Sequence, residues 1–138
     1  MYRHLVLANP GSINAQGALE PALALAGAFG ARLTMIVVER PPRFALFLRD
    51  IDDACAAIDT RSNFIITHAQ ERAVRLDIAF DARRVVGDLA PCVLRFLAQT
   101  PADLLVIARK STTLASWVGG AGRLFREAPC ALHVVRPR

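Results

Sequence analysis

The last third of the chain, Thr100–Arg138, constrains the fold more than any other stretch. Two short apolar runs, Leu104–Ile107 and Leu132–Val135, are separated by a polar loop, a glycine cluster and a helical pattern. Two buried strands joined through a helix form a βαβ unit, and such a unit requires a parallel sheet. Ligands of open parallel sheets bind beyond the carboxyl ends of the strands. We therefore expect the loop Ala108–Gly122, which leaves the first of these strands, to form one wall of any small-molecule site.

The rest of the chain repeats this alternation of strands and helices. Further strands are predicted at Leu5–Ala8 and Leu33–Val38, where apolar and β-branched residues lie between turn signals. The stretch Ile78–Val86 alternates less cleanly, but its end, Val85 and Val86 before Gly87, predicts a third strand that closes at a turn. Helices are predicted between the strands, one of them with Asp88 as its N-cap and with Pro91 tolerated in its first turn. This alternation predicts one α/β domain over residues 1–138, a three-layer sandwich with helices on both faces of a parallel sheet.

The first helix carries conflicting boundary signals. Ser12 and Asn14 are candidate caps, and apolar residues then recur at helical spacing up to a stop signal at Gly30. A proline inside a helix costs about 3 kcal/mol. Because of Pro21, we expect the helix to begin near Glu20 or to kink there.

The stretch Phe44–Leu76 is mostly helical by pattern. Its polar segment Thr60–Asn63 predicts a break, so we expect two helices here. The apolar residues of the first helix fall on one face, which we expect to be buried: Phe44, Phe47, Leu48, Ile51, Cys55 and Ile58.

Composition excludes several classes of protein. Hydrophobic residues make up 54% of the 138 residues, too many for a disordered chain. The net charge of +5 comes from arginines spread along the chain, so we do not expect a nucleic-acid partner. The three cysteines share no metal-ligand spacing and predict a reduced, cytoplasmic compartment. No stretch is long and apolar enough to predict a secretory signal or a membrane span.

Candidate site residues lie in the loop and at the start of the last helix. Lys110 and the hydroxyl residues Ser111–Thr113 could contact phosphates, or they could form a solvated polar loop. Glycines are costly inside a helix, so the cluster Gly119–Gly122 predicts that the last helix begins near Gly120. Its N-terminus could bind an anion, or the glycines could allow tight packing against the sheet or a dimer partner. No spacing of histidines, cysteines or carboxylates predicts a metal or catalytic site.

Four segments carry a resemblance to a known family: His4–Ser12, Val85–Pro91, Ala102–Ile107 and Ala128–Val135. Through them the chain resembles the universal stress protein family over nearly its whole length, most weakly between residues 41 and 76. The resemblance implies a five-stranded parallel sheet of order 3-2-1-4-5, a homodimer and a cytoplasmic, stress-related role.

The resemblance extends less well to nucleotide binding. ATP-binding members of that family carry an aspartate after the first strand and a Gly-x-x-Gly pair after the fourth, where this chain has Pro10, Ala108 and Ser111. The loop that follows is also shorter here. The chain is therefore more similar to the universal stress protein A subgroup, which is not expected to hold ATP.

These observations predict a non-enzymatic stress-response protein that needs no cofactor and acts through contacts with other proteins. Its homodimer is expected to form along the edge strand Leu132–Val135, because an exposed apolar edge needs a partner. The alternative is a universal stress regulator that binds ATP or AMP at a degenerate phosphate loop. Its site would be made of Asn9, Val38, Lys110, Ser111, Gly119 and Gly120.

Overall fold

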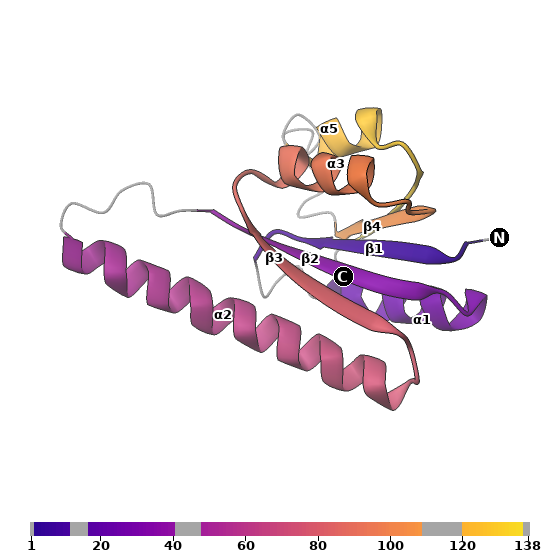
Figure 1. Cartoon of the computed structure of the whole chain (residues 1–138), viewed down its shortest axis with the longest axis horizontal. Coiled ribbons are helices and arrows are strands. Elements are labelled where there is room, and N and C mark those ends of the chain that lie inside the picture. The colour runs from indigo at the N-terminus through magenta and orange to yellow at the C-terminus, as the bar shows by residue number, and fades with distance from the viewer. Residues whose placement is uncertain (1, 12–16, 41–47, 109–119, 137–138) are drawn as a thin grey trace.

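Five parallel strands form one sheet in the order β3-β2-β1-β4-β5 (Figure 1). The computed structural model describes residues 2–11, 17–40, 48–108 and 120–136, and for 48–51, 120 and 121 the backbone alone. The strands are β1 (His4–Asn9), β2 (Arg32–Glu39), β3 (Phe80–Val86), β4 (Leu104–Ala108) and β5 (Ala131–Val135). Every neighbouring pair is parallel, so the predicted sheet and its strand order are confirmed.

Helices cover both faces of the sheet, as predicted. They are α1 (Leu19–Phe29), α2 (Leu48–Arg75), α3 (Leu89–Gln99) and α5 (Gly120–Glu127). Successive strand residues point to opposite faces. Leu7 accordingly belongs to a buried cluster with Leu23 of α1 and Ile65 of α2, whereas its neighbour Val6 belongs to a second cluster with residues of α3 and α5. The central strands β1, β2 and β4 are buried on both sides, and the edge strands β3 and β5 are partly exposed.

Helix α1 resolves the conflicting boundary signals. The candidate caps Ser12 and Asn14 lie outside the described residues, and Ala18 holds the N-cap position instead, because a short 3₁₀ turn precedes the helix. Pro21 falls in the first turn, where its missing N–H has no intrahelical partner to lose. Gly30 ends the helix as predicted, in the left-handed conformation at φ +62° that glycine adopts at little cost.

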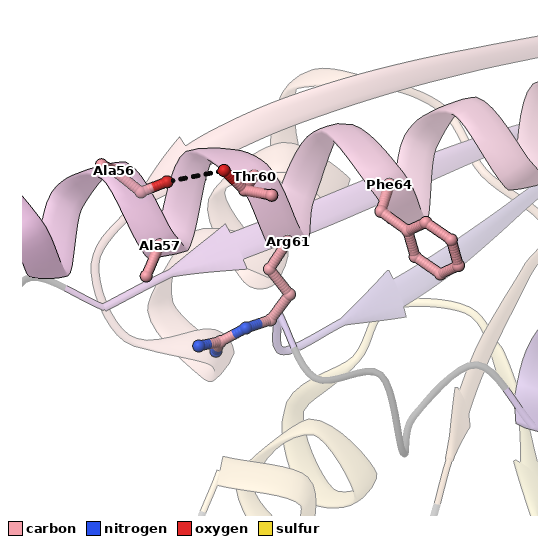
Figure 2. A pocket seen from close by; sticks show the side chains of 5 residues that line it. All are labelled: Ala56, Ala57, Thr60, Arg61 and Phe64. Atoms are coloured by element: carbon pink, nitrogen blue, oxygen red, sulfur yellow. Dashed lines mark hydrogen bonds between the residues drawn. The ribbon is translucent and has the colours of Figure 1, made fainter.

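Helix α2 runs unbroken for 28 residues, so the predicted break at Thr60–Asn63 is wrong. The Thr60 hydroxyl donates a hydrogen bond of 3.0 Å to the carbonyl of Ala56, one turn earlier, and is satisfied within the helix (Figure 2). Ser62 is buried, and Asn63 accepts a hydrogen bond from Arg84 of β3. The side chains of Thr60 and Asn63 therefore have hydrogen-bond partners without any break in the helix.

The second half of α2 covers the sheet. Among the α2 side chains that the structure describes, those that are buried all lie in this half: Ser62, Ile65, Ala69 and Ala73. The first turns extend past the ends of the strands (Figure 1). Cys55 is exposed and Ile58 half-buried, so the predicted apolar face is not buried as a unit; Phe44 and Phe47, and the side chains of Leu48 and Ile51, lie outside what the structure describes.

The remaining boundaries follow the sequence closely. Strand β3 begins at Phe80, somewhat later than predicted, and Asp88 takes the N-cap position of α3 with an extended backbone. Helix α5 is described from Gly120 and ends just before Ala128 and Pro129, as expected. Among the described residues, no helix combines the length and the apolar character that crossing a membrane requires.

Candidate functional site

The carboxyl ends of β1, β2 and β4 form the candidate site, because the helices change face there. Strand β1 pairs with β2 on one side and with β4 on the other. Helices α1 and α2 contribute to the core on one face, and α3 and α5 to the core on the other. The connections thus diverge between β1 and β4, which is the place where open α/β sheets bind ligands. The strands end there at Asn9, Glu39 and Ala108.

A tight turn closes the end of β1. Asn9 is buried, and its Oδ1 accepts a hydrogen bond of 2.8 Å from the N–H of Gly11. Gly11 has φ +76°, and a Cβ placed on it would lie 3.1 Å from the carbonyl oxygen of Val38. Only glycine suits both the conformation and the close approach. Asn9 therefore shapes the turn that lies against the end of β2.

Helix α2 reaches the same turn through one side chain. Arg61 Nη1 donates a hydrogen bond of 3.3 Å to the carbonyl of Gly11. Neither Gly11 nor Arg61 is among the site residues predicted from the sequence. The Asn-x-Gly spacing could have indicated the bond from Gly11 to Asn9, since asparagine commonly bonds the backbone two residues ahead. Nothing in the sequence links Arg61 to Gly11, which is 50 residues away.

The structure brings together two of the six predicted nucleotide-site residues. Asn9 and Val38 meet through the Gly11 turn, but the Val38 side chain is buried in the core, which leaves its backbone as the group at the strand end. Gly120 is the first residue of α5. Lys110, Ser111 and Gly119 lie outside the described residues, as do residues 109–119 of the loop predicted to wall the site, whose last residues begin α5. The site assignment therefore stays a prediction.

Charged side chains near the carboxyl ends of β2 and β3 are paired with one another. Arg84 of β3 donates to Glu39 at 2.7 Å and also to Asp59 of α2. Hydrogen bonding to Asp59, and then to Glu39, raises the pKa of the Arg84 guanidinium. Arg40, which follows β2, lies 3.7 Å from the carboxylate of Asp88. These arginines serve to tie β2, β3, α2 and α3 together.

At the other end of the strands, a carboxylate joins the amino ends of β1 and β4. Asp103 Oδ2 accepts the backbone N–H groups of Arg3 at 2.8 Å and His4 at 2.9 Å, and these bonds lower the pKa of Asp103. The buried His4 ring lies 2.8 Å from both the carbonyl of Pro101 and the hydroxyl of Thr34. His4 is therefore a hydrogen-bonded core residue at the edge away from the candidate site.

No chemistry of metals or thiols is indicated by the described part of the chain. Within it, no three histidines, cysteines or acidic residues are placed to hold a metal ion. Cys55, Cys92 and Cys130 are unpaired there. Burial raises the pKa of the Cys130 thiol, which disfavours the reactive thiolate.

Comparison with known proteins places the chain in a family. A model described as the universal stress protein family matches residues 1–136, so the chain belongs to that family. A search of curated proteins finds no match.

Solved structures show the same fold. A protein of this family from Burkholderia pseudomallei is 27% identical, with a TM-score of 0.77 and coverage of 99% of this chain and 97% of that one. A universal stress protein in complex with cAMP is 20% identical, with a TM-score of 0.76 and coverage of 99% and 98%. An Arabidopsis thaliana member with AMP bound is 12% identical, with a TM-score of 0.70 and coverage of 99% and 92%.

Proposed function

We propose that this universal stress protein acts without catalysis, as a cytoplasmic homodimer that contacts other proteins, and that it belongs with the A subgroup. The observation that carries the proposal is the composition of the β5 edge. Strand β5 holds only Ala131, Leu132, His133, Val134 and Val135. Its side chains are half-buried or exposed, and it ends the sheet. An edge strand without charges is open to pairing with another chain.

A second copy satisfies such an edge by symmetry. Two β5 strands related by a two-fold axis pair antiparallel and extend the sheet from five strands into a continuous ten across the dimer, which follows from doubling the observed sheet. The exposed His133 is the middle residue of β5 and would lie close to its counterpart. The other sheet edge, β3, carries Asp81, Arg83 and Arg84 and is protected by these charges.

The test places like charges on the β5 edge. His133→Glu should raise the dimer dissociation constant at least about a hundredfold, because like charges across an interface cost several kcal/mol. The matched control, Arg83→Glu, alters an exposed residue of the β3 edge and should leave the dimer intact. Light scattering across a range of protein concentrations measures both. A wild-type monomer at micromolar concentration, or equal effects of the two variants, would refute the β5 dimer.

A second function, binding of an adenine nucleotide, is supported by the geometry of the candidate site. The Asn9–Gly11 turn presents backbone at the divergence point of the sheet, beside the end of β2. Related folds have been solved with cAMP and with AMP. The binding group here would be the backbone of these strand ends, because the Val38 side chain is in the core.

Thermal unfolding with AMP, cAMP and ATP distinguishes the two functions. A nucleotide present at a hundred times its dissociation constant should add about 2.7 kcal/mol to the unfolding free energy. Gly11→Val should remove that response, because its side chain would press on the Val38 carbonyl. A flat response of the wild-type protein to all three nucleotides leaves the first proposal alone.

A further inference from the structure

The exposed edge strand β5 has a histidine at its centre. We propose that His133 makes association through β5 sensitive to acid. The dimer forms while the two His133 rings that face each other across the two-fold axis are neutral, and it dissociates when both rings take up protons. This inference rests on the homodimer proposed above and adds the regulation of that interface.

Full overlap of two β5 strands sets His133 opposite itself. In an antiparallel pair, the numbers of residues that face each other have a constant sum. If Ala131–Val135 pairs along its whole length, Ala131 faces Val135 of the copy and Leu132 faces Val134. The centre of the strand then faces its own counterpart, with the two His133 Cβ atoms about 4.5 to 5.5 Å apart and on the same face of the joined sheet.

The strand next to β5 offers no charge to the His133 ring. His133 is in register with Val106 of β4, and all five residues of β4 are apolar. Leu132 and Val134 point to the other face of the sheet, where they pack against the buried cluster of α3 and α5. The side chains of α3 and α5 therefore lie across the sheet from His133.

Acidic groups on the His133 side of the sheet have other partners. The cluster on this face, to which α1 contributes, includes Val135. The acidic residue of α1 is Glu20, whose carboxylate accepts hydrogen bonds from Arg72. Asp103, at the start of β4, accepts two backbone N–H groups. Among the described residues, these contacts leave no carboxylate placed to neutralise two facing imidazolium rings.

The ends of the paired strands do not add a clash of their own. The same register places Arg136, which follows β5, opposite Cys130 of the copy. Burial raises the pKa of the Cys130 thiol and keeps it neutral. The facing His133 rings are therefore the position at which this register brings two like charges together.

Neutral and protonated rings interact in opposite ways at this distance. A neutral imidazole has one N–H donor and one acceptor nitrogen, so two neutral rings are compatible neighbours. A protonated imidazole has donors alone, and like charges directly opposite on neighbouring strands are destabilising. Histidine gains its proton between pH 8 and pH 5. Separated chains then bind more protons than the dimer, so the dimer is favoured at the higher pH and lost as the pH falls through this range.

The first experiment compares pH 8 with pH 5. The dissociation constant of the wild-type dimer, measured by light scattering over a series of concentrations, should rise at least about tenfold at pH 5. Glu20 and Asp103 stay ionised at pH 5, because hydrogen bonding lowers the pKa of both. Circular dichroism verifies that the chain is folded at both values. A monomer at pH 8 would refute the β5 dimer, and a dimer equally stable at both values would refute the acid response alone.

Substitutions of His133 assign the response to its ring. His133→Gln keeps a polar side chain that does not titrate, so its dissociation constant should change less than about twofold between the two pH values. His133→Lys is charged at both values and should associate at pH 8 as weakly as wild type does at pH 5. The control is His68→Gln, on an exposed residue of α2, which should keep the wild-type response. Acid dissociation of His133→Gln, or its loss in His68→Gln, would overturn the proposal.

A disulfide tests whether His133 faces itself. In a background whose three native cysteines are replaced by serine, His133→Cys should form a covalent dimer with oxidised glutathione at pH 8. Ala131→Cys is the matched control, because the two copies of residue 131 would lie about 13 Å apart along the strands, and a disulfide needs Cα atoms within about 7 Å. Cross-linking of Ala131→Cys in place of His133→Cys would show another register and would overturn the proposal.

Discussion

The two edge strands of the sheet differ in length and in charge. Strand β3 has seven residues, carries exposed charges and is tied to α2 through Arg84, which contacts Asp59 and Asn63. Strand β5 has five residues and no charged side chain. One edge thus carries charges that disfavour pairing with another chain, and the other carries none. The stability of the β3 edge should therefore depend on intramolecular contacts, whereas the stability of the β5 edge should depend on protein concentration.

The largest expected effect is at the turn that follows β3. Gly87 has φ +145°, and a Cβ placed there would lie 2.9 Å from the Cys92 sulfur. Gly87→Ala should lower the unfolding free energy by about 2 to 3 kcal/mol, because it combines a strained backbone with crowding. Urea denaturation measures the change. Gly17→Ala is the control, since a Cβ on Gly17 would meet nothing within 4 Å, and it should change stability by less than about 0.5 kcal/mol.

The next effect sharpens the contrast at β5. If β5 pairs with a second copy, each tenfold increase in protein concentration should raise the apparent unfolding free energy by about 1.4 kcal/mol per mole of dimer, half of that per chain. His133→Glu should abolish this dependence, and Arg83→Glu on the opposite edge should preserve it. Thermal melts over a hundredfold range of concentration would reveal it. A wild-type unfolding temperature that does not change with protein concentration would remove the distinction between the two edges.

Within the β3 edge, the two neighbouring arginines should differ. Arg84 contacts Glu39, Asp59 and Asn63 from two other elements, whereas Arg83 pairs at 3.4 Å with Asp81 of its own strand. Arg84→Gln should cost about 1 kcal/mol, because it breaks a network around the largely buried Glu39 carboxylate. Arg83→Gln should cost less than about 0.5 kcal/mol, as an isolated exposed pair does. Equal costs would show that the Arg84 network does not brace this edge.

The sheet could be predicted from the sequence because its signals are local. The runs Leu5–Ala8, Leu33–Val38 and Leu104–Ile107 are short, apolar and bounded by turn residues, and the structure buries all three on both faces. Gly30 and Asp88 likewise act through their own backbone positions. The strand order came from the resemblance, since local patterns do not specify which strands are neighbours.

What the sequence could not reveal depends on partners far along the chain. The polar segment around Thr60–Asn63 looks like a break until Arg84 is placed beside it. Cys55 looks like a core residue until α2 is seen to extend past the sheet. Asp103 bonds backbone groups 99 and 100 residues away, and Arg61 bonds Gly11 across 50. The candidate site is predictable only in its location, because the strand ends are local features and the side chains around them are not.

The smallest expected effect is the pH dependence of the ion pair that joins α2, the helix bonded to β3, to α1. Arg72 of α2 donates two hydrogen bonds, of 2.6 and 3.0 Å, to the carboxylate of Glu20 in α1, and this bonding lowers the Glu20 pKa below its ordinary value of 4.5. A carboxyl group whose pKa is lower in the folded state stabilises the protein above its unfolded pKa, and this stabilisation is lost as the pH falls through the folded pKa. Because the Glu20 side chain is 56% exposed, the contribution should be only about 0.5 kcal/mol.

Arg72→Gln isolates that contribution. The unfolding free energies of wild type and variant should differ by about 0.5 kcal/mol at pH 7 and converge as the pH falls below the ordinary Glu20 value. Part of the acid sensitivity should survive in the variant, because Asp103 also has a lowered pKa and lies between β1 and β4, on the β5 side of the sheet. A difference that persists unchanged in acid would assign the Arg72 effect to packing of its stem rather than to the ion pair, and would leave α2 held to α1 by apolar contacts alone.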